Sequence, residues 1–139
     1  MSIEEENKAK QRRVFEEALN KGNMAVVDEV IDTNYVSESP QGLVNGTEAM
    51  KQGFATLRNA FPDIAFTVED MIAEEDKVVS RVKCRGTHKG EFMGIAPTGK
   101  KMEINGIIIT RWVDGKELEA WEVIDMLGMM QQLGAIPLQ

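Results

Sequence analysis

The pattern of apolar positions predicts helices in the first half of the chain. Residues 3–20 are mostly good helix formers, and Ser2 followed by Glu5 has the spacing of a capping box at the start of a helix. Apolar residues recur along this segment at helical spacing, which predicts one buried stripe that ends near Gly22: Val14, Phe15, Ala18 and Leu19.

Two further helices are predicted, separated by a loop. Asn23 can cap a short second helix with an apolar side, made up of Val26, Val27, Val30 and Ile31. Residues 32–46 are polar and contain Pro40, so this segment is predicted to be mostly loop. A third helix is expected to begin after Thr47 and end at Pro62, with apolar positions at Met50, Phe54, Leu57 and Phe61.

After Pro62 the apolar period changes from that of a helix to that of a strand. Strands are predicted over residues 64–69, 77–88, 102–112 and 117–124. Asp114-Gly115 is a strong hairpin turn signal between the last two strands. A short helix is expected to close the chain, capped by Asp125 and ended by Gly134.

The predicted strands differ in how many of their faces are apolar. Over residues 77–88 the alternation directs Cys84 and His88 inward, with Cys84 an inert core thiol. The outward row is expected to face water: Arg81, Lys83 and Arg85. Residues 102–112 are apolar on both faces, which predicts a strand buried on both sides.

Helices followed by consecutive strands favour an α+β fold, in which helices pack on one face of a curved antiparallel sheet. The length of 139 residues suits one domain over residues 1–139. A curved sheet of this kind can leave a pocket between its concave face and the helices.

The composition narrows the function classes. A net charge of −7 argues against nucleic acid and anionic membranes as partners. With one cysteine and one histidine, a typical zinc site is not expected, and no internal disulfide can form. The apolar runs are too short for a membrane span and the first residues are acidic, so we expect a cytoplasmic protein. No phosphate-binding loop or serine nucleophile motif is present.

Glu122 is the chemically unusual residue of the last strand. Its predicted face is otherwise apolar, consisting of Leu118, Ala120 and Ile124. An apolar pocket would raise the pKa of the Glu122 carboxyl toward neutrality, where it could serve as a general acid and base. The alternative is a carboxylate that is paired with Arg111 or lies near the pocket mouth.

Several motifs together resemble the SnoaL-like polyketide cyclase (ester cyclase) family. They are AFPD at residues 60–63, GTHKGEFMGIAPTG at 86–99, the tail from WEVIDMLG to QQLG at 121–134, FEE at 15–17 and NKGN at 20–23. The resemblance implies a cone-shaped α+β barrel of the nuclear transport factor 2-like type, which is usually a dimer formed through the sheet. It also implies ring closure by an intramolecular aldol step without a metal or cofactor.

The resemblance implies a set of site residues. The family's carboxylate, commonly aspartate, falls on Glu122, and a Thr-His-x-Gly histidine at the pocket falls on His88. His88 could instead be a strand-end histidine that is hydrogen-bonded to backbone. Asp125 is either the helix cap or a second pocket carboxylate, and the cap is preferred. The predicted substrate-binding residues are Tyr35, Phe54, Phe92, Ile108 and Ala120.

The chain also departs from the family pattern. Relatives often carry a histidine after Tyr35-Val36 and polar residues at positions 108 and 120, where this chain has Ser37, Ile108 and Ala120. Two hypotheses stay open. One is a cofactor-free cyclase or isomerase acting on a small hydrophobic carbonyl compound, in which Glu122 moves the proton and His88 stabilises the oxyanion. The other is a non-catalytic dimer that binds a small apolar ligand or serves as an accessory protein.

Overall fold

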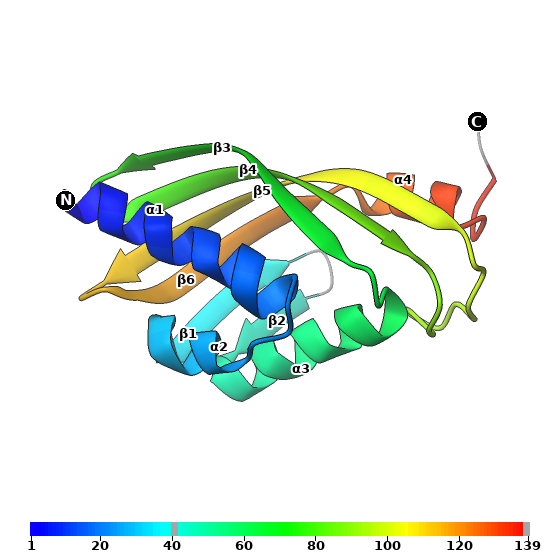
Figure 1. Ribbon diagram of the computed structural model, residues 1–139, viewed down its shortest axis with the longest axis horizontal. Coiled ribbons are helices and arrows are strands. Elements are labelled where there is room, and N and C mark those ends of the chain that lie inside the picture. The colour runs from blue at the N-terminus through cyan, green and yellow to red at the C-terminus, as the bar shows by residue number, and fades with distance from the viewer. Residues whose placement is uncertain (40–41, 138–139) are drawn as a thin grey trace.

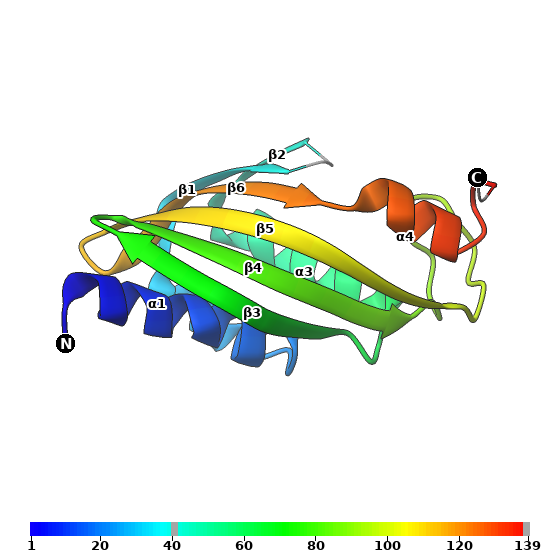
Figure 2. The ribbon, with the colours of Figure 1, turned by 90° about the horizontal axis from the view of Figure 1, so that it is seen from above.

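The computed structural model describes residues 1–39 and 42–137, which form a curved six-stranded sheet with helices on its concave side (Figures 1 and 2). The helices are α1 (Ile3–Arg13), η1 (Val14–Leu19), α2 (Ala25–Val30), α3 (Gly46–Ala60) and α4 (Met126–Gln132). The strands are β1 (Ile31–Ser39), β2 (Gly42–Asn45), β3 (Ala65–Glu74), β4 (Lys77–Thr87), β5 (Lys101–Val113) and β6 (Lys116–Ile124). The expected α+β class is therefore confirmed.

The sheet has the strand order β2-β1-β6-β5-β4-β3. Neighbouring strands are antiparallel with one exception, because β1 and β6 run parallel. The sheet is thus mixed, and the expectation of a wholly antiparallel sheet was wrong. Helix α3 connects the β1–β2 edge to β3 across the concave face, which allows β1 to lie parallel beside the last strand (Figure 1).

The first helix begins as predicted but changes its winding. The Ser2 hydroxyl accepts a hydrogen bond from the backbone N–H of Glu5 at 3.1 Å, so the predicted N-cap is confirmed. From Val14 onward the backbone is π-helical, and the N–H of Asn20 donates to the Phe15 carbonyl at 2.9 Å. The predicted apolar stripe lies in this π-helical segment, and all four of its side chains are buried.

The predicted loop over residues 32–46 was wrong, because the structure has strands β1 and β2 there, joined at the edge of the sheet. Along β1, Tyr35 and Ser37 point inward and Val36 is exposed. Since the inward row is mostly polar, the apolar alternation that identifies a strand is missing. Pro40, which also supported the loop, lies outside the described residues.

The remaining elements match their predictions within a few residues, except that β3 is longer than the predicted strand 64–69. Strand β5 buries one face, with Ile104 and Ile108 in the core. On its other face Ile107 is 47% exposed, so burial on both sides does not hold within one chain. No helix within residues 1–39 and 42–137 has the length and apolar composition to cross a bilayer.

Candidate functional site

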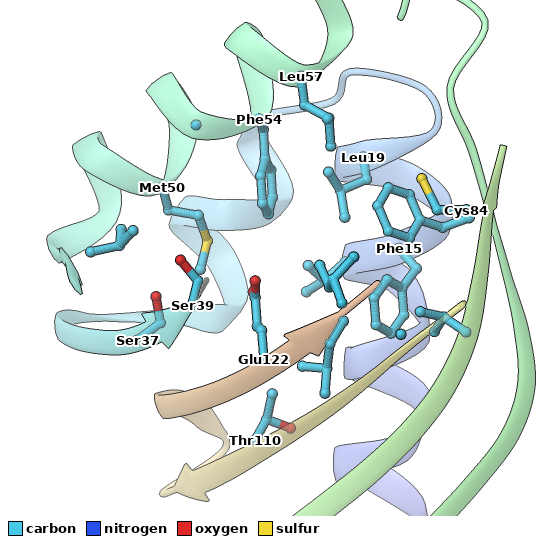
Figure 3. Close-up of a pocket in the computed structure, with 18 of the residues that line it drawn as sticks. Phe15, Leu19, Ser37, Ser39, Met50, Phe54, Leu57, Cys84, Thr110 and Glu122 are labelled. Carbon is cyan, nitrogen blue, oxygen red and sulfur yellow. The ribbon is translucent and has the colours of Figure 1, made fainter. Parts of the chain in front are cut away.

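A cavity of about 310 Å³ lies between the concave face of the sheet and the helices. Figure 3 shows the side chains that surround it, from η1, α3 and the central strands. The wall is mostly apolar, with Phe15, Phe54 and Cys84 among its members. Exposed positions on α3, such as Gly53 and Thr56, also line it, so the cavity reaches the surface beside this helix. This shape suits a small, largely apolar ligand.

Glu122 projects from β6 into the middle of this cavity, as predicted (Figure 3). Its cross-strand neighbour on β5 is Ile108, which is buried and also lines the cavity. Loss of hydration in this apolar setting raises the pKa of the Glu122 carboxyl above its usual value.

The alternative in which Glu122 pairs with Arg111 is not what the structure shows. The Arg111 Nε donates to Glu119 Oε1 at 2.7 Å, and Arg111 also lies 4.0 Å from the Asp76 carboxylate. Glu119 is on the outward face of β6, so the arginine is held away from the cavity. Glu122 therefore stands in the cavity without the cation that would keep its pKa low.

A second buried carboxylate, Glu117, also lines the cavity. Strand alternation alone places residue 117 on the outward face with residues 119 and 121. A β-bulge lies between the pairs Trp112↔Glu117 and Arg111↔Glu119, and the extra residue, Leu118, reverses the alternation. Glu117 therefore shares the inward face of Trp112. The hairpin signal at residues 114–115 could have located it, because a two-residue turn pairs residue 117 with residue 112.

Tyr35 on β1, one of the predicted substrate-binding residues, lies beside Glu117. Both residues line the cavity, and each is 3% exposed. Burial raises the pKa of Glu117 to about 8, and the nearby Glu122 charge adds a smaller increase. A hydrogen bond from the Tyr35 hydroxyl lowers this pKa and so opposes both effects. The pKa of Tyr35 is also raised, chiefly by burial. At neutral pH the Glu117 carboxyl is thus mainly protonated.

His88 does not line the cavity within the described part of the chain, contrary to its predicted role. Its ring lies beside Phe61, with ring centroids 5.5 Å apart, and is fully buried. The backbone N–H of Thr98 donates to His88 Nδ1 at 3.3 Å, and the Thr98 hydroxyl lies 3.0 Å from the same nitrogen. The structure therefore supports the alternative of a strand-end histidine that holds the loop after β4.

The other predicted residues divide into two groups. Phe54, Phe92 and Ile108 line the cavity, as expected for substrate contacts. Ala120 shares the inward face with Glu122 but is covered in the core, so its predicted contact with a ligand is not supported. Asp125 caps α4, because its Oδ1 accepts from the Gly128 N–H at 2.8 Å.

Cys84 is a further titratable group in the wall of the cavity. The Cys84 thiol faces it, and burial raises the pKa of this thiol to about 12, which keeps it unreactive at neutral pH. Residues 1–39 and 42–137 contain no grouping of three or more His, Cys, Asp or Glu side chains that could hold a metal ion. The prediction that the protein uses no metal stays a prediction.

Comparisons with known proteins agree on one family. The family model described as SnoaL-like polyketide cyclase matches residues 9–133. Nogalonic acid methyl ester cyclase of Streptomyces nogalater is 29% identical over 120 residues, covering 84% of this chain and 90% of that protein. Aklanonic acid methyl ester cyclase AcmA of Streptomyces galilaeus is 31% identical over 121 residues, covering 85% and 84%. The structure of TsrD from Streptomyces laurentii superposes with a TM-score of 0.89 at 25% identity, covering 98% of this chain and 100% of that one.

Proposed function

Because the chain belongs to the SnoaL-like polyketide cyclase family, we propose that it closes a ring in a small hydrophobic carbonyl compound by an intramolecular aldol reaction in the cavity. The observation that carries this proposal is the Glu122 carboxyl, which stands in an apolar cavity with a raised pKa. Such a carboxyl can both accept and return a proton near neutral pH.

In the proposed reaction, the ionised Glu122 carboxylate removes a proton from a carbon next to a substrate carbonyl. The carbon left as an enolate attacks a second carbonyl of the same molecule, so one carbon–carbon bond forms. The oxygen of the second carbonyl then takes the proton back from the Glu122 carboxylic acid. Atoms and charge balance within the substrate, and neither an oxidant nor a second substrate is needed.

The apolar wall supports this chemistry in two ways. It excludes water from the enolate, and it holds a flexible chain in a folded form in which its two carbonyl carbons can meet. His88 was expected to stabilise the oxyanion, but its burial beside Phe61 outside the cavity wall gives it no contact with a substrate there. We therefore assign proton transfer to Glu122 alone.

The test compares the parent protein with Glu122→Gln, using aklanonic acid methyl ester and nogalonic acid methyl ester as substrates and chromatography to separate the cyclised products. We expect Glu122→Gln to lower turnover by about 10²–10⁴-fold, the usual contribution of a general acid and base. Glu119→Gln is the matched control, because this carboxylate lies on the other face of the same strand, and it should keep parent activity.

Equal turnover in the parent protein and Glu122→Gln would remove Glu122 as the base. If the parent protein binds both esters but turns over neither, the non-catalytic ligand-binding hypothesis replaces the enzyme. The pH dependence gives an independent check. Because burial raises the pKa of Glu122, the rate should begin to rise at a higher pH than an ordinary glutamate would give.

We also propose a homodimer that forms through the outer face of the sheet. Ile107 on β5 and Val123 on β6 are cross-strand neighbours, and 47% and 74% of their surfaces are exposed. Adjoining apolar side chains on the same face extend the patch, at Ile72, Val79, Ile109 and Trp121.

We further propose that this one-domain protein acts in the cytoplasm, where the lone, buried Cys84 suits a reducing compartment.

A further inference from the structure

One end of the cavity is polar, and the proposed proton transfer does not use it. Glu117 on β6 and Gln11 on α1 both line the cavity, and both side chains are almost fully buried. Helix α1 packs against β3 and β4, and its Lys10 side chain reaches the β5–β6 hairpin, where the ammonium donates to the Gly115 carbonyl at 2.9 Å. This contact holds the Gln11 turn of α1 beside the part of β6 that carries Glu117.

Two oxygens at this end lack hydrogen-bond partners. Within the described residues, Gln11 Oε1 and Glu117 Oε1 are both buried and neither receives a hydrogen bond. A buried polar atom without a partner typically costs about 1–3 kcal/mol of stability. Buried polar atoms without partners are rare in native folds and need an explanation. Because these two atoms lie in a cavity wall, a bound ligand can supply the missing hydrogen bonds.

Neighbouring side chains define which ligand group fits. The Tyr35 hydroxyl interacts with both Ser37 and Glu117, and Thr110 Oγ1, which also lines the cavity, already accepts from the Trp112 indole N–H at 2.8 Å. The free atoms are therefore acceptors. An anionic ligand group is disfavoured here, because it would lose its hydration in a mostly apolar cavity and would lie near the Glu122 carboxylate, whose charge already acts on Glu117. A neutral hydroxyl group both donates and accepts, so it complements this end.

We propose that Gln11, Tyr35 and Glu117 form a polar subsite that binds a hydroxyl group at one end of an otherwise apolar substrate. This inference rests on the proposed function, because it assigns a substrate feature to the same cavity. It implies a substrate that carries a hydroxyl group, inserted with this hydroxyl toward the hairpin end and its apolar body along the wall beside Phe15 and Phe54.

The raised pKa of Glu117 supports this subsite. A carboxyl group that is mainly protonated at neutral pH can donate a hydrogen bond as well as accept one, so it can pair with a hydroxyl in either direction. The other titratable groups that face this carboxyl are Tyr35, which hydrogen-bonds to it, and Glu122, whose charge acts on it.

The test measures binding of two probes of the same shape, 1-naphthol and 1-methylnaphthalene, by isothermal titration calorimetry. The reported quantity is the ratio of their dissociation constants, because the methyl probe has a methyl group of similar size in place of the hydroxyl. Glu117→Met keeps the side-chain length and removes the polar group, so it should cut the preference for 1-naphthol about five- to tenfold, as expected for one hydrogen bond. Gln11→Met should also reduce the preference for 1-naphthol. It provides the test if Glu117→Met does not fold.

Glu119→Gln is the control, since this carboxylate lies on the outward face of β6, where it pairs with Arg111, and its loss leaves the cavity and the subsite in place. We expect it to keep the parent ratio. A ratio that is unchanged in Glu117→Met and Gln11→Met, an equal fall in Glu119→Gln, or a parent protein that binds neither probe would each overturn the subsite. The two proposals fail separately: turnover that survives Glu122→Gln removes the catalytic role, whereas an unchanged probe ratio removes only the subsite.

Discussion

Glu117 makes folding depend on pH, because its carboxyl is buried beside Tyr35 and Trp112 and, within residues 1–39 and 42–137, forms no ion pair. In the unfolded chain this group has an ordinary pKa near 4.5, and in the folded protein the pKa is about 8. Between these values the unfolded chain has already lost the proton that the folded protein keeps. The free energy of unfolding therefore falls as pH rises from about 4.5 to 8, by up to about 1.4 kcal/mol per pH unit, and levels off above this range.

Glu117→Gln should remove this dependence, because a neutral amide does not titrate. Urea unfolding at pH 5, 6, 7, 8 and 9 measures the free energy of unfolding, and we expect the variant to lose less stability than the parent across this range. Glu91→Gln, which removes an exposed carboxylate from the loop after β4, is the control and should follow the parent. Parallel pH profiles for the parent and Glu117→Gln would show that burial does not raise the pKa.

The two cavity carboxylates also show what the sequence can reveal at the scale of one residue. Glu122 could be predicted, because it interrupts an apolar row and strand alternation places it inward. Glu117 could not be predicted from alternation, because the bulge at Leu118 reverses the faces on its side of the strand. His88 shows the opposite error: alternation gave its inward direction correctly, but Phe61 and the loop at Thr98 enclose it outside the cavity wall.

At the scale of elements, Asn20 connects the end of η1 to the edge strand β3. Its side-chain amide donates to the Phe66 carbonyl at 3.0 Å, and its Oδ1 accepts from the Phe66 N–H at 2.7 Å. Arg58 on α3 donates to the carbonyls of Leu19 and Asn20 at 2.7 and 2.8 Å, which satisfies the end of the π-helical segment. Asn20 thus joins the end of η1 to strand β3 beside Phe15 and Leu19 of the cavity wall.

Asn20→Ala removes both hydrogen bonds to Phe66 and leaves that backbone without partners in a partly buried place. We expect the free energy of unfolding to fall by about 2 kcal/mol, from two hydrogen bonds of about 1 kcal/mol each. Asn34→Ala, at an exposed position of β1, is the control and should change stability little. Urea denaturation measures both variants, and equal stability for Asn20→Ala and the control would contradict this role.

Elements were predictable where they bury an apolar row and were missed where they do not. The stripe on the first helix and the rows of β4 and β5 repeat clearly, so their types and approximate bounds follow from the sequence. Strands β1 and β2 were missed because the inward row of β1 carries Tyr35 and Ser37, whose polar side chains line the cavity. The polarity that concealed this strand thus belongs to the candidate site.

At the scale of the whole molecule, the two faces of the sheet have different tasks. The concave face and the helices enclose a cavity. Its size could not be predicted from the sequence pattern, because it depends on how α3 and η1 cross the sheet. The outer face has no helix covering it in the described part of the chain (Figure 2), although apolar side chains continue across its central strands. Contiguous apolar surface of this kind usually marks an interface.

Val123 is the best position at which to test this interface, because it is 74% exposed and is the cross-strand neighbour of Ile107 in the middle of the outer face. A two-fold axis brings the same patch of both chains together, so Val123→Glu would place like charges close to one another in an apolar contact. Such a juxtaposition costs several kcal/mol, about a hundredfold or more in the dissociation constant of the dimer. Sedimentation velocity should show a dimer for the parent protein and a monomer for Val123→Glu.

Leu127→Glu provides the matched control, since Leu127 is 63% exposed but lies on α4 rather than on the sheet. It should leave the dimer intact. A monomeric parent protein, or dissociation by Leu127→Glu with no effect of Val123→Glu, would place the outer face outside any interface. Because Glu122 points to the opposite face of β6 from Val123, the monomeric variant should keep its cavity, and 1-naphthol binding to Val123→Glu tests whether the site is complete within one chain.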